Sequence, residues 1–209
     1  MKKSELVIIL IILSSFVLGF YFYPYMPDLV ASHWNVRGQV DGYISKFWGL
    51  FLMPLLSLGL FLLFLLIPKI DPLKENIEKF RRYFDWFIVL VMFFLFYLYL
   101  LTIFWNLGFR FNLIQLLIPS FCLLYYYAGI LIENAKRNWF IGIRTPWTLS
   151  NDKVWDKTHR LGGKLFKLSA GAAFLGIFLQ NLAIYFVVIP IILTSIYLFI
   201  YSYLEYRSL

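Results

Sequence analysis

Five long apolar runs constrain this chain more than any other feature of its sequence. As an α-helix, each of the first four is long enough to cross a hydrocarbon core of about 30 Å. These four runs are residues 5–23, 47–68, 83–105 and 113–132. The last run, residues 167–204, is too long for one crossing, and we divide it at its strongly polar interior residues, Gln180 and Asn181. The sequence therefore predicts an all-α polytopic integral membrane protein with six transmembrane helices.

Composition and flanking residues agree with this prediction. With 62% hydrophobic and only 14% charged residues, the chain is not a water-soluble globular protein. The first run follows Lys2 and Lys3, but it is longer than a signal-peptide core and lacks a small-residue cleavage site, so we expect it to be retained. The lone Cys122 excludes an intrachain disulfide and a cysteine metal cluster.

The distribution of basic residues predicts the orientation of the chain. With the N terminus in the cytoplasm, 16 of the 19 Lys and Arg residues fall in cytoplasmic segments, and Arg37, Lys46 and Arg110 fall outside. Basic residues accumulate on the cytoplasmic side, so both termini are expected there. The net charge of +8 is explained by attraction of juxtamembrane basic residues to anionic lipid headgroups. Because no soluble basic module is present, we expect no direct nucleic-acid partner.

The spans and loops suggest two parts. We expect an N-terminal two-span part, residues 1–82, with an extracellular loop at 24–46, and a C-terminal four-span part, residues 83–209, with a cytoplasmic loop at 133–166. Ionisable residues are absent from the span centres, and Glu5, Asp85 and Glu133 lie near span ends. A proton-relay transporter is therefore disfavoured, because such proteins keep ionisable groups near the bilayer midplane.

The cytoplasmic loop is polar, basic and rich in tryptophan. Ser150 is expected to cap a helix that continues towards the fifth span, and one face of that helix carries Trp155, Thr158, His159 and Gly162. The donors of Arg144 with Thr145 and of His159 with Arg160 suit a phosphate or a carboxylate. The alternative is that the tryptophans anchor the loop at the membrane interface, the charges face solvent, and Arg144 bonds helix C-terminal carbonyls.

The extracellular loop has two interpretations. Pro27 and Asp28 favour the start of a short helix, and Gly38 and Gly42 mark turns. Asp28, His33 and Asp41 are residue types that bind metals, but one histidine with dispersed carboxylates is weak evidence, and we predict no metal. The preferred interpretation is an interfacial anchor made by His33 and Trp34.

An enzymatic role is not indicated. The predicted topology places His33 outside and His159 inside, so the two histidines cannot share a site. The sequence contains no glycine-rich phosphate loop and no paired-histidine metal motif. We predict no catalytic residues and no cofactor.

Two motifs resemble a known family over essentially the full length of the chain. The internal motif consists of Asn138, Trp139, Gly142, Ile143, Arg144, Thr145, Pro146, Trp147, Thr148, Leu149, Val154, Trp155, Thr158, His159, Arg160 and Gly163. The N-terminal motif consists of Pro27, Val30, His33, Trp34, Asn35, Gly38, Asp41 and Gly42. The internal motif resembles the signature of the SdpI immunity-protein family, and the N-terminal motif resembles the small domain of unknown function that often precedes it.

The resemblance implies a six-span protein that protects a cell from a secreted antimicrobial peptide and draws a transcriptional repressor to the membrane. We expect a peptide toxin to meet the outer loop and a repressor the inner loop, although many relatives have no evident cognate toxin. The inner binding set is Asn138, Trp139, Gly142, Arg144, Thr145, Pro146, Trp147, Trp155, Thr158, His159, Arg160 and Gly163. The outer set is Pro27, His33, Trp34, Asn35, Gly38 and Asp41. The alternatives are a lipid-headgroup enzyme or transporter using Arg144 and His159, and a structural membrane subunit.

Overall fold

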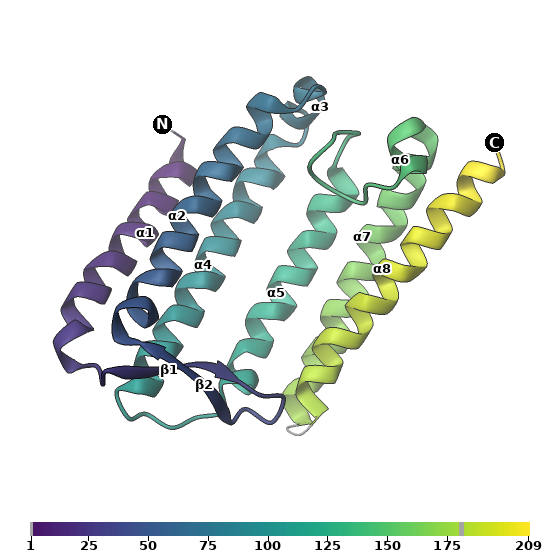
Figure 1. The fold of residues 1–209 in the computed structure, drawn as a ribbon. Coiled ribbons are helices and arrows are strands. Elements are labelled where there is room, and N and C mark those ends of the chain that lie inside the picture. Colours follow the sequence, from purple (N-terminus) through teal and green to yellow (C-terminus); the bar gives the residue numbers. More distant parts are fainter. Residues whose placement is uncertain (1, 180–181) are drawn as a thin grey trace. The chain divides into compact units, whose positions relative to one another are not determined.

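The computed structural model describes residues 2–179 and 182–209. Within them, six helices are long and apolar enough to cross a membrane (Figure 1). They are α1 (Lys3–Phe22), α2 (Lys46–Ile70), α4 (Arg81–Asn106), α5 (Leu113–Asn134), α7 (Asp152–Leu175) and α8 (Ala183–Arg207). The prediction of a six-span, all-α membrane protein is confirmed. The turn that we placed at Gln180 and Asn181 lies outside the described residues.

Six shorter elements connect or extend these helices. They are η1 (Tyr23–Tyr25), β1 (Leu29–Trp34), β2 (Val40–Ser45), α3 (Lys74–Glu78), α6 (Pro146–Ser150) and η2 (Gly176–Phe178). The chain forms two compact units, one made of Met1–Leu63 with Ile88–Leu117 and the other of Phe64–Phe87 with Ile118–Leu209. Helices α2, α4 and α5 contribute residues to both units. The division of the chain at residue 82 stays a prediction.

The first unit has a hydrophobic core that fixes the β-hairpin to the helices. Its buried members are Met26, Val30, Leu50, Phe51, Tyr99 and Ile103. The Tyr99 hydroxyl also donates a hydrogen bond to the Ser15 carbonyl, at 3.2 Å, so α4 and α1 are joined by a polar contact as well as by packing. The hairpin lies across the ends of α1, α2 and α4 (Figure 1).

The short helix expected at Pro27 and Asp28 is wrong, because this segment leads into strand β1. Strands β1 and β2 pair antiparallel, from Leu29 opposite Ser45 to Trp34 opposite Val40. Val30 is 2% exposed and packs in the core of the first unit. A β-branched residue suits this half-buried pleated surface, and burial of one strand face outweighs the local preference of a proline for a helix start.

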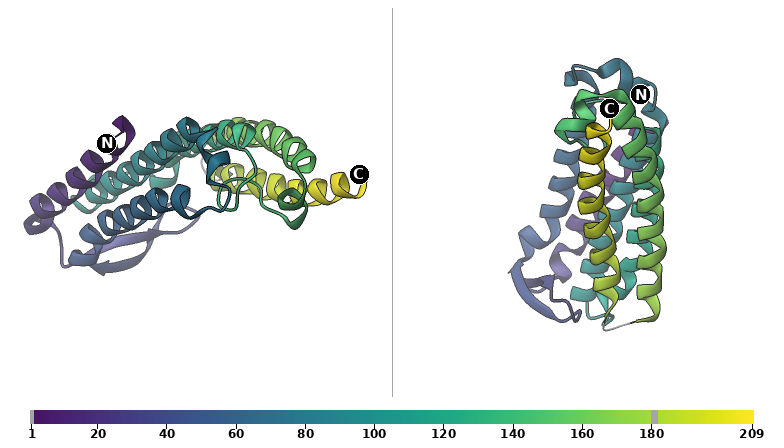
Figure 2. Two further views of the ribbon diagram at one scale, coloured as in Figure 1. Left: turned by 90° about the horizontal axis from the view of Figure 1, so that it is seen from above. Right: turned by 90° about the vertical axis from the view of Figure 1, so that its right-hand side faces the viewer.

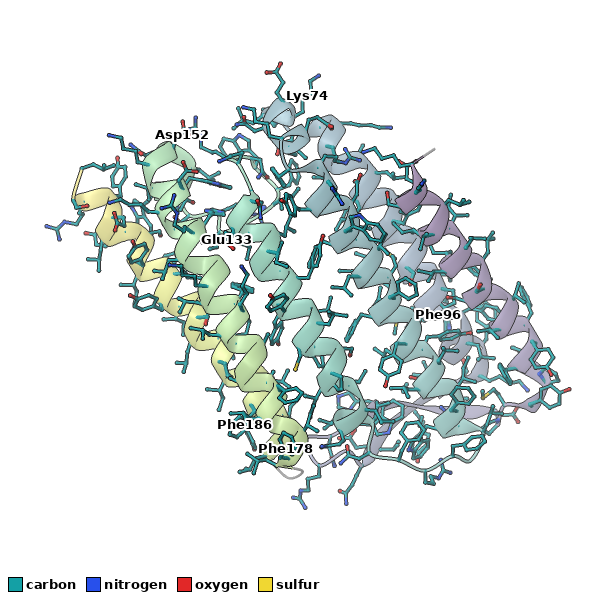
Figure 3. The ribbon with its side chains drawn as sticks, turned by 180° about the vertical axis from the view of Figure 1, so that it is seen from behind. Lys74, Phe96, Glu133, Asp152, Phe178 and Phe186 are labelled. Atoms are coloured by element: carbon teal, nitrogen blue, oxygen red, sulfur yellow. The ribbon has the colours of Figure 1, made fainter. Side chains whose placement is uncertain are left out.

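The second unit contains α7 and α8, which lie side by side and antiparallel (Figures 1 and 2). Ser169 and Thr194 hydrogen-bond between the two helices at 3.0 Å. A Cβ at Gly176 would lie 3.0 Å from the Ala183 carbonyl, so the absence of a side chain here permits a close approach to the start of α8. Phe178 and Phe186 mark the end of the pair remote from Asp152 (Figure 3).

Helix α7 is one continuous element from the loop after α5 into the fifth span, as the sequence predicted. Its expected cap, Ser150, is wrong by one residue, because Ser150 ends α6. Asn151 is the cap, and its Oδ1 accepts the backbone N–H groups of Lys153 and Val154 at 2.8 and 3.3 Å. Both residues belong to the class that caps helices well, so the local propensity was correct and the fold of α6 decided the position.

Candidate functional site

The side chain of Asn138 folds the segment that connects α5 to α6. It is 0% exposed. Its Oδ1 accepts the N–H groups of Phe140 and Ile141, at 2.9 and 2.6 Å. Its Nδ2 donates to the carbonyls of Lys136 and Ile141, both at 2.8 Å. The amide therefore uses two donors and two acceptor positions, and one side chain bonds four backbone groups of this turn.

His159 is buried against the same segment and has both ring nitrogens occupied. The Ile143 N–H donates to Nε2 at 3.0 Å, and Nδ1 lies 2.8 Å from the Trp155 carbonyl. An amide N–H can only donate and a carbonyl can only accept. These partners therefore fix the neutral tautomer with its proton on Nδ1. In this structure His159 positions the loop and offers no donor to an anion.

Trp155 completes this support. Its ring stacks on the imidazole of His159, with centroids 3.8 Å apart and planes inclined by 15°. Its indole Nε1 donates to the Ala135 carbonyl at 2.8 Å, so a residue of α7 also binds the backbone that follows α5. Trp155 is 1% exposed, so its side chain lies inside the folded loop.

Gly142 makes the close approach of the loop to α7 possible. Its φ is +112°, in the region that favours glycine. A Cβ at this position would lie 2.4 Å from His159 Nε2 and 3.4 Å from the Trp155 ring. The residue therefore serves both as a turn and as the space into which the imidazole fits.

Thr145 and Thr148 cap the short helix α6 and tie it to α8. The Thr145 Oγ1 accepts the Thr148 N–H at 3.2 Å, and the Thr148 Oγ1 accepts the Thr145 N–H at 2.9 Å. Thr145 Oγ1 also lies 3.0 Å from the hydroxyl of Ser202 on α8. Pro146 occupies the first helical position, where its missing N–H costs nothing. Trp147 packs edge-on to Phe199 of α8, and the membrane-interface anchor expected of the tryptophans stays a prediction.

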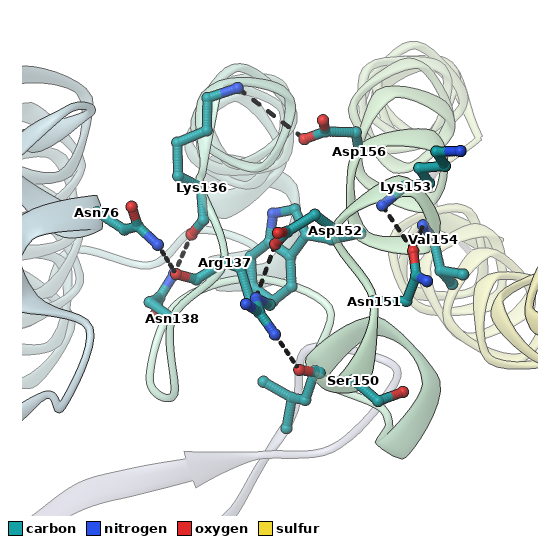
Figure 4. Close-up of polar contacts among 12 residues, drawn as sticks. Asn76, Lys136, Arg137, Asn138, Ser150, Asn151, Asp152, Lys153, Val154 and Asp156 are labelled. Atoms are coloured by element: carbon teal, nitrogen blue, oxygen red, sulfur yellow. Dashed lines mark hydrogen bonds and ion pairs between the residues drawn. The ribbon is translucent and has the colours of Figure 1, made fainter.

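A buried acidic residue that the sequence analysis missed holds the loop from the α2–α3 connection. Asp71 is 2% exposed. Its Oδ2 accepts the Trp139 N–H at 2.9 Å, and its Oδ1 accepts the Leu73 N–H at 2.6 Å. Nearby, Asn76 Nδ2 donates to the Arg137 carbonyl at 2.9 Å (Figure 4). The available signal was the Asp-Pro pair directly after a span, which favours a turn but does not name a partner.

Arg137 links the start of the loop to the start of α7. Its Nε lies 2.7 Å from Asp152 Oδ1, and its Nη1 donates to the Leu149 carbonyl at 2.9 Å (Figure 4). Lys136 reaches Asp156 across a longer distance of 3.9 Å. These contacts neutralise two acidic residues at the beginning of α7.

The remaining inner residues divide between packing and exposure. A Cβ at Gly163 would lie 2.9 Å from the Gly129 carbonyl, so this glycine lets α7 approach α5. Thr158 is fully buried, and its Oγ1 has no hydrogen-bond partner among the described residues. The exposed members of the inner set are Trp139, Arg144, Pro146 and Arg160. Arg144 donates from Nη1 to the Trp139 carbonyl at 2.9 Å, a loop carbonyl and not a helix C-terminal one.

The outer set lies on the hairpin. His33 Nδ1 and Asp41 Oδ1 are 2.5 Å apart, with side chains 71% and 45% exposed. Asn35 Oδ1 accepts the N–H groups of Arg37 and Gln39 and so shapes the turn, where Gly38 has a φ of +74°. Pro27 is exposed just before β1. His33 and Asp41 are thus available to a ligand, while Asn35 and Gly38 maintain the turn.

Aromatic contacts hold the tip of the hairpin. Trp34 meets Trp105 edge-on, with centroids 5.7 Å apart, and the guanidinium of Arg110 lies 3.9 Å from the centroid of the Trp105 ring. Trp34 thus packs against another tryptophan, and its expected role as an interfacial anchor stays a prediction. Among the described residues no group of three His, Cys, Asp or Glu side chains is placed to hold a metal ion.

Asn106, at the end of α4, is a second residue that the sequence analysis missed. Its Oδ1 accepts the Ala31 N–H at 2.7 Å, and its Nδ2 donates to the Ala31 carbonyl at 3.1 Å. One amide thus closes the outer edge of β1 as a neighbouring strand would. In sequence Asn106 reads only as the polar end of a span, and its partner is 75 residues away.

We expect Asn106→Leu to loosen the hairpin and leave the helices intact. The substitution leaves a buried N–H and a carbonyl without partners, at about 1–3 kcal/mol each. Limited proteolysis of right-side-out vesicles should then cut within residues 29–45 at least about tenfold faster, since 1.4 kcal/mol is a factor of ten in an equilibrium constant. Asn134→Leu, at the end of α5 where the amide donates to the Ile130 carbonyl of the same helix, is the control, and equal cutting of both variants would contradict this role.

Comparisons with known proteins agree with both motifs. Residues 134–202 match the SdpI/YfhL protein family, and residues 10–58 match a domain of unknown function, DUF1648. The chain is 24% identical over 208 residues to the Immunity protein SdpI of Bacillus subtilis (strain 168), which covers 99% of this chain and 98% of that protein. No solved structure matches. The resemblance to the SdpI family is confirmed, and the chain is a multi-pass protein of the cell membrane.

Proposed function

We propose that this chain is a non-enzymatic immunity protein that protects the cell from a secreted antimicrobial peptide. The observation that carries the proposal is the similarity to the Immunity protein SdpI, which extends over 99% of the chain and includes both motif regions. In this proposal the hairpin meets the peptide outside the cell. The loop between α5 and α7 meets a cytoplasmic protein, such as a transcriptional repressor.

The surface of the hairpin supports recognition of an amphipathic peptide. The exposed His33–Asp41 pair lies on the same hairpin as the apolar side chains of Leu29, Val36 and Tyr43, which are 64%, 57% and 58% exposed. A polar pair offers hydrogen bonds, and exposed apolar groups offer area that becomes buried on binding. An antimicrobial peptide that enters membranes presents both kinds of group.

The inner loop supports recognition of a protein because one group of its residues is buried and fixes the backbone, while another group is exposed. Asn138, Trp155 and His159 are buried and fix the backbone. Trp139, which is 51% exposed, and Arg144 stand on the outside of that frame, joined by a hydrogen bond. Tryptophan and arginine are the residues most enriched at the energetic centres of protein interfaces.

The competing lipid-headgroup activity receives less support. It would require His159 to exchange a proton or to contact the headgroup, but both ring nitrogens bond to protein groups. A structural membrane subunit remains the third candidate, and it is distinguished by tolerance of substitutions on both exposed surfaces.

Protection from the peptide should depend on the exposed surface of the hairpin. In Bacillus subtilis lacking its own SdpI, we expect the wild-type chain to restore growth in the presence of toxin-producing cells. If the hairpin binds the peptide, His33→Ala should lower the tolerated peptide concentration about tenfold, because a hydrogen bond to a charged group contributes roughly 1.5–3 kcal/mol. The exposed pair adds little to folding, so membrane levels should not fall.

Controls separate the three candidates. Arg37→Ala removes an exposed charge from the hairpin turn and should keep full protection. Arg144→Ala should keep protection and lose the cytoplasmic response, measured as repressor recruitment, while Lys153→Ala keeps both. Absence of protection by the wild type at any expression level would overturn immunity to that peptide. Full tolerance of His33→Ala and Arg144→Ala would favour a structural subunit.

A further inference from the structure

A polar groove between α7 and α8 lies outside the hairpin and the α5–α7 loop used in the function proposed above, and of the inner set Arg160 lines it. Its volume is about 420 Å³. Five lining residues come from α7 and two from α8, and together they are Asp156, Lys157, Arg160, Leu161, Lys164, Tyr201 and Glu205. We call this the α7–α8 groove.

Two positive charges in the α7–α8 groove are uncompensated. Lys157 Nζ pairs with Glu205 Oε2 at 2.6 Å, and Asp156 faces Lys136 at 3.9 Å. Arg160 and Lys164 are exposed and have no hydrogen-bond or ionic partner in the part of the chain that the structure describes. Being four residues apart, they share a face of α7 with Cβ atoms roughly 5–6 Å apart. One anionic group can therefore contact both.

The packing of α7 against α5 places these charges at a membrane boundary. A Cβ at Gly163 would lie 2.7 Å from Glu133 Cβ. Because α5 ends at Asn134, residue 163 of α7 lies beside the last turn of that span. Arg160 and Lys164 thus flank the depth at which the hydrocarbon core gives way to lipid headgroups.

The face of α7 that carries the two cations continues as an apolar surface. Leu168 and Leu175 follow Lys164 by four and eleven residues and are 68% and 52% exposed. On α8, Tyr197 lies one turn from Tyr201, stacks on it with centroids 6.2 Å apart and is 53% exposed. A soluble phosphate would need only the polar groove, whereas a lipid would also use this apolar strip.

We propose that the α7–α8 groove is a specific site for an anionic phospholipid. Arg160 and Lys164 bind the headgroup phosphate, Arg160 by a paired hydrogen bond from its planar guanidinium. An acyl chain lies along Leu168 and Leu175. The site is on the side that the charge distribution assigns to the cytoplasm, where anionic lipids attract juxtamembrane basic residues.

The test is lipid binding to the full chain, measured by native mass spectrometry with phosphatidylglycerol and with phosphatidylcholine. We expect the wild type to retain one phosphatidylglycerol at least about tenfold more tightly than phosphatidylcholine. The Arg160→Gln/Lys164→Gln double variant should lose this preference. The control, Lys74→Gln/Lys153→Gln, removes the same charge from exposed lysines outside the groove and should keep it.

Further measurements distinguish a lipid from free phosphate as the ligand and control for misfolding. An excess of inorganic phosphate should leave the lipid bound, and displacement by phosphate would overturn a lipid site. Equal loss in both double variants would show attraction to net charge only and would also overturn the proposal. Lys164→Gln alone, at an exposed position, should give an intermediate loss. If it gives none although the chain remains folded, the assigned site is wrong.

Discussion

Asn138→Asp is expected to destabilise the second unit by about 3–5 kcal/mol, the range for a buried charge that lacks a partner. The substitution preserves the shape of the side chain and the two accepted hydrogen bonds. It replaces the two donors of Nδ2 by an oxygen that faces the carbonyls of Lys136 and Ile141. In a side chain that is 0% exposed, this repulsion cannot be relieved by water.

The measurement is thermal unfolding in detergent, monitored through the reaction of Cys122 with a thiol-reactive dye. Cys122 is the single cysteine of the chain and lies within α5, so it should become reactive when the helices separate. The same chemical change at Asn151 is the matched control. Asn151 only accepts N–H groups at the start of α7, where a carboxylate is favourable, so Asn151→Asp should unfold at or above the wild-type temperature.

An acidic buffer sharpens this test. A protonated carboxyl regains one donor, so the loss caused by Asn138→Asp should be smaller at mildly acidic pH than at neutral pH. The introduced group favours folding in its protonated form, and its penalty therefore grows as the pH rises. A loss that does not change with pH, or one that Asn151→Asp shares, would contradict the role assigned to Asn138.

Gly142→Ala is expected to lower the stability of the second unit by several kcal/mol, through two distinct effects. A φ of +112° is strained for an L-residue, at about 1–3 kcal/mol. The added methyl would also lie 2.4 Å from His159 Nε2, and overpacking of this kind costs roughly 1–3 kcal/mol. Loss of the Ile143–His159 hydrogen bond should follow, because the loop must move away from α7.

A double-mutant cycle separates these effects. His159→Ala alone loses the hydrogen bonds of both ring nitrogens, but in the Gly142→Ala background it also removes the steric overlap. The two changes together should therefore cost less than the sum of the single losses by about 1 kcal/mol or more. Gly171→Ala is the control, since nothing lies within 4 Å of a Cβ there, and it should not lower the unfolding temperature. Additive losses would show that the imidazole does not occupy the space beside Gly142.

The buried residues of the inner motif show why the candidate site was only partly predictable. The sequence identified the inner motif and its resemblance to the SdpI family, and both are confirmed. It also predicted that Trp155, Thr158 and His159 share a face of one helix, which follows from helical spacing alone. It assigned that face to ligand binding, whereas in the structure these three residues are buried. Amino-acid type and spacing identify a face but not what covers it.

The roles of Asp71 and Asn106 could not be predicted from the sequence, and the physical reason is the same for both. Asp71 bonds the Trp139 N–H across 68 positions, and Asn106 bonds Ala31 across 75. Each looks in sequence like an ordinary polar residue at the end of a span. The hairpin was missed for a related reason, because the burial of Val30 against helices from other parts of the chain outweighs the local signals at Pro27.

The six spans could be located from the sequence alone, because the thickness of the bilayer imposes a length and an apolar composition that each helix meets independently of the others. By the same local logic the sequence predicted that α7 runs unbroken from the loop into the membrane. Tertiary packing sets which motif residues face inward and which face outward, and among the described residues it leaves Arg160 and Lys164 without a partner. Hydrogen bonds and ion pairs depend on distances of about 3 Å between side chains and backbone, and only the folded chain sets such distances between residues far apart in sequence.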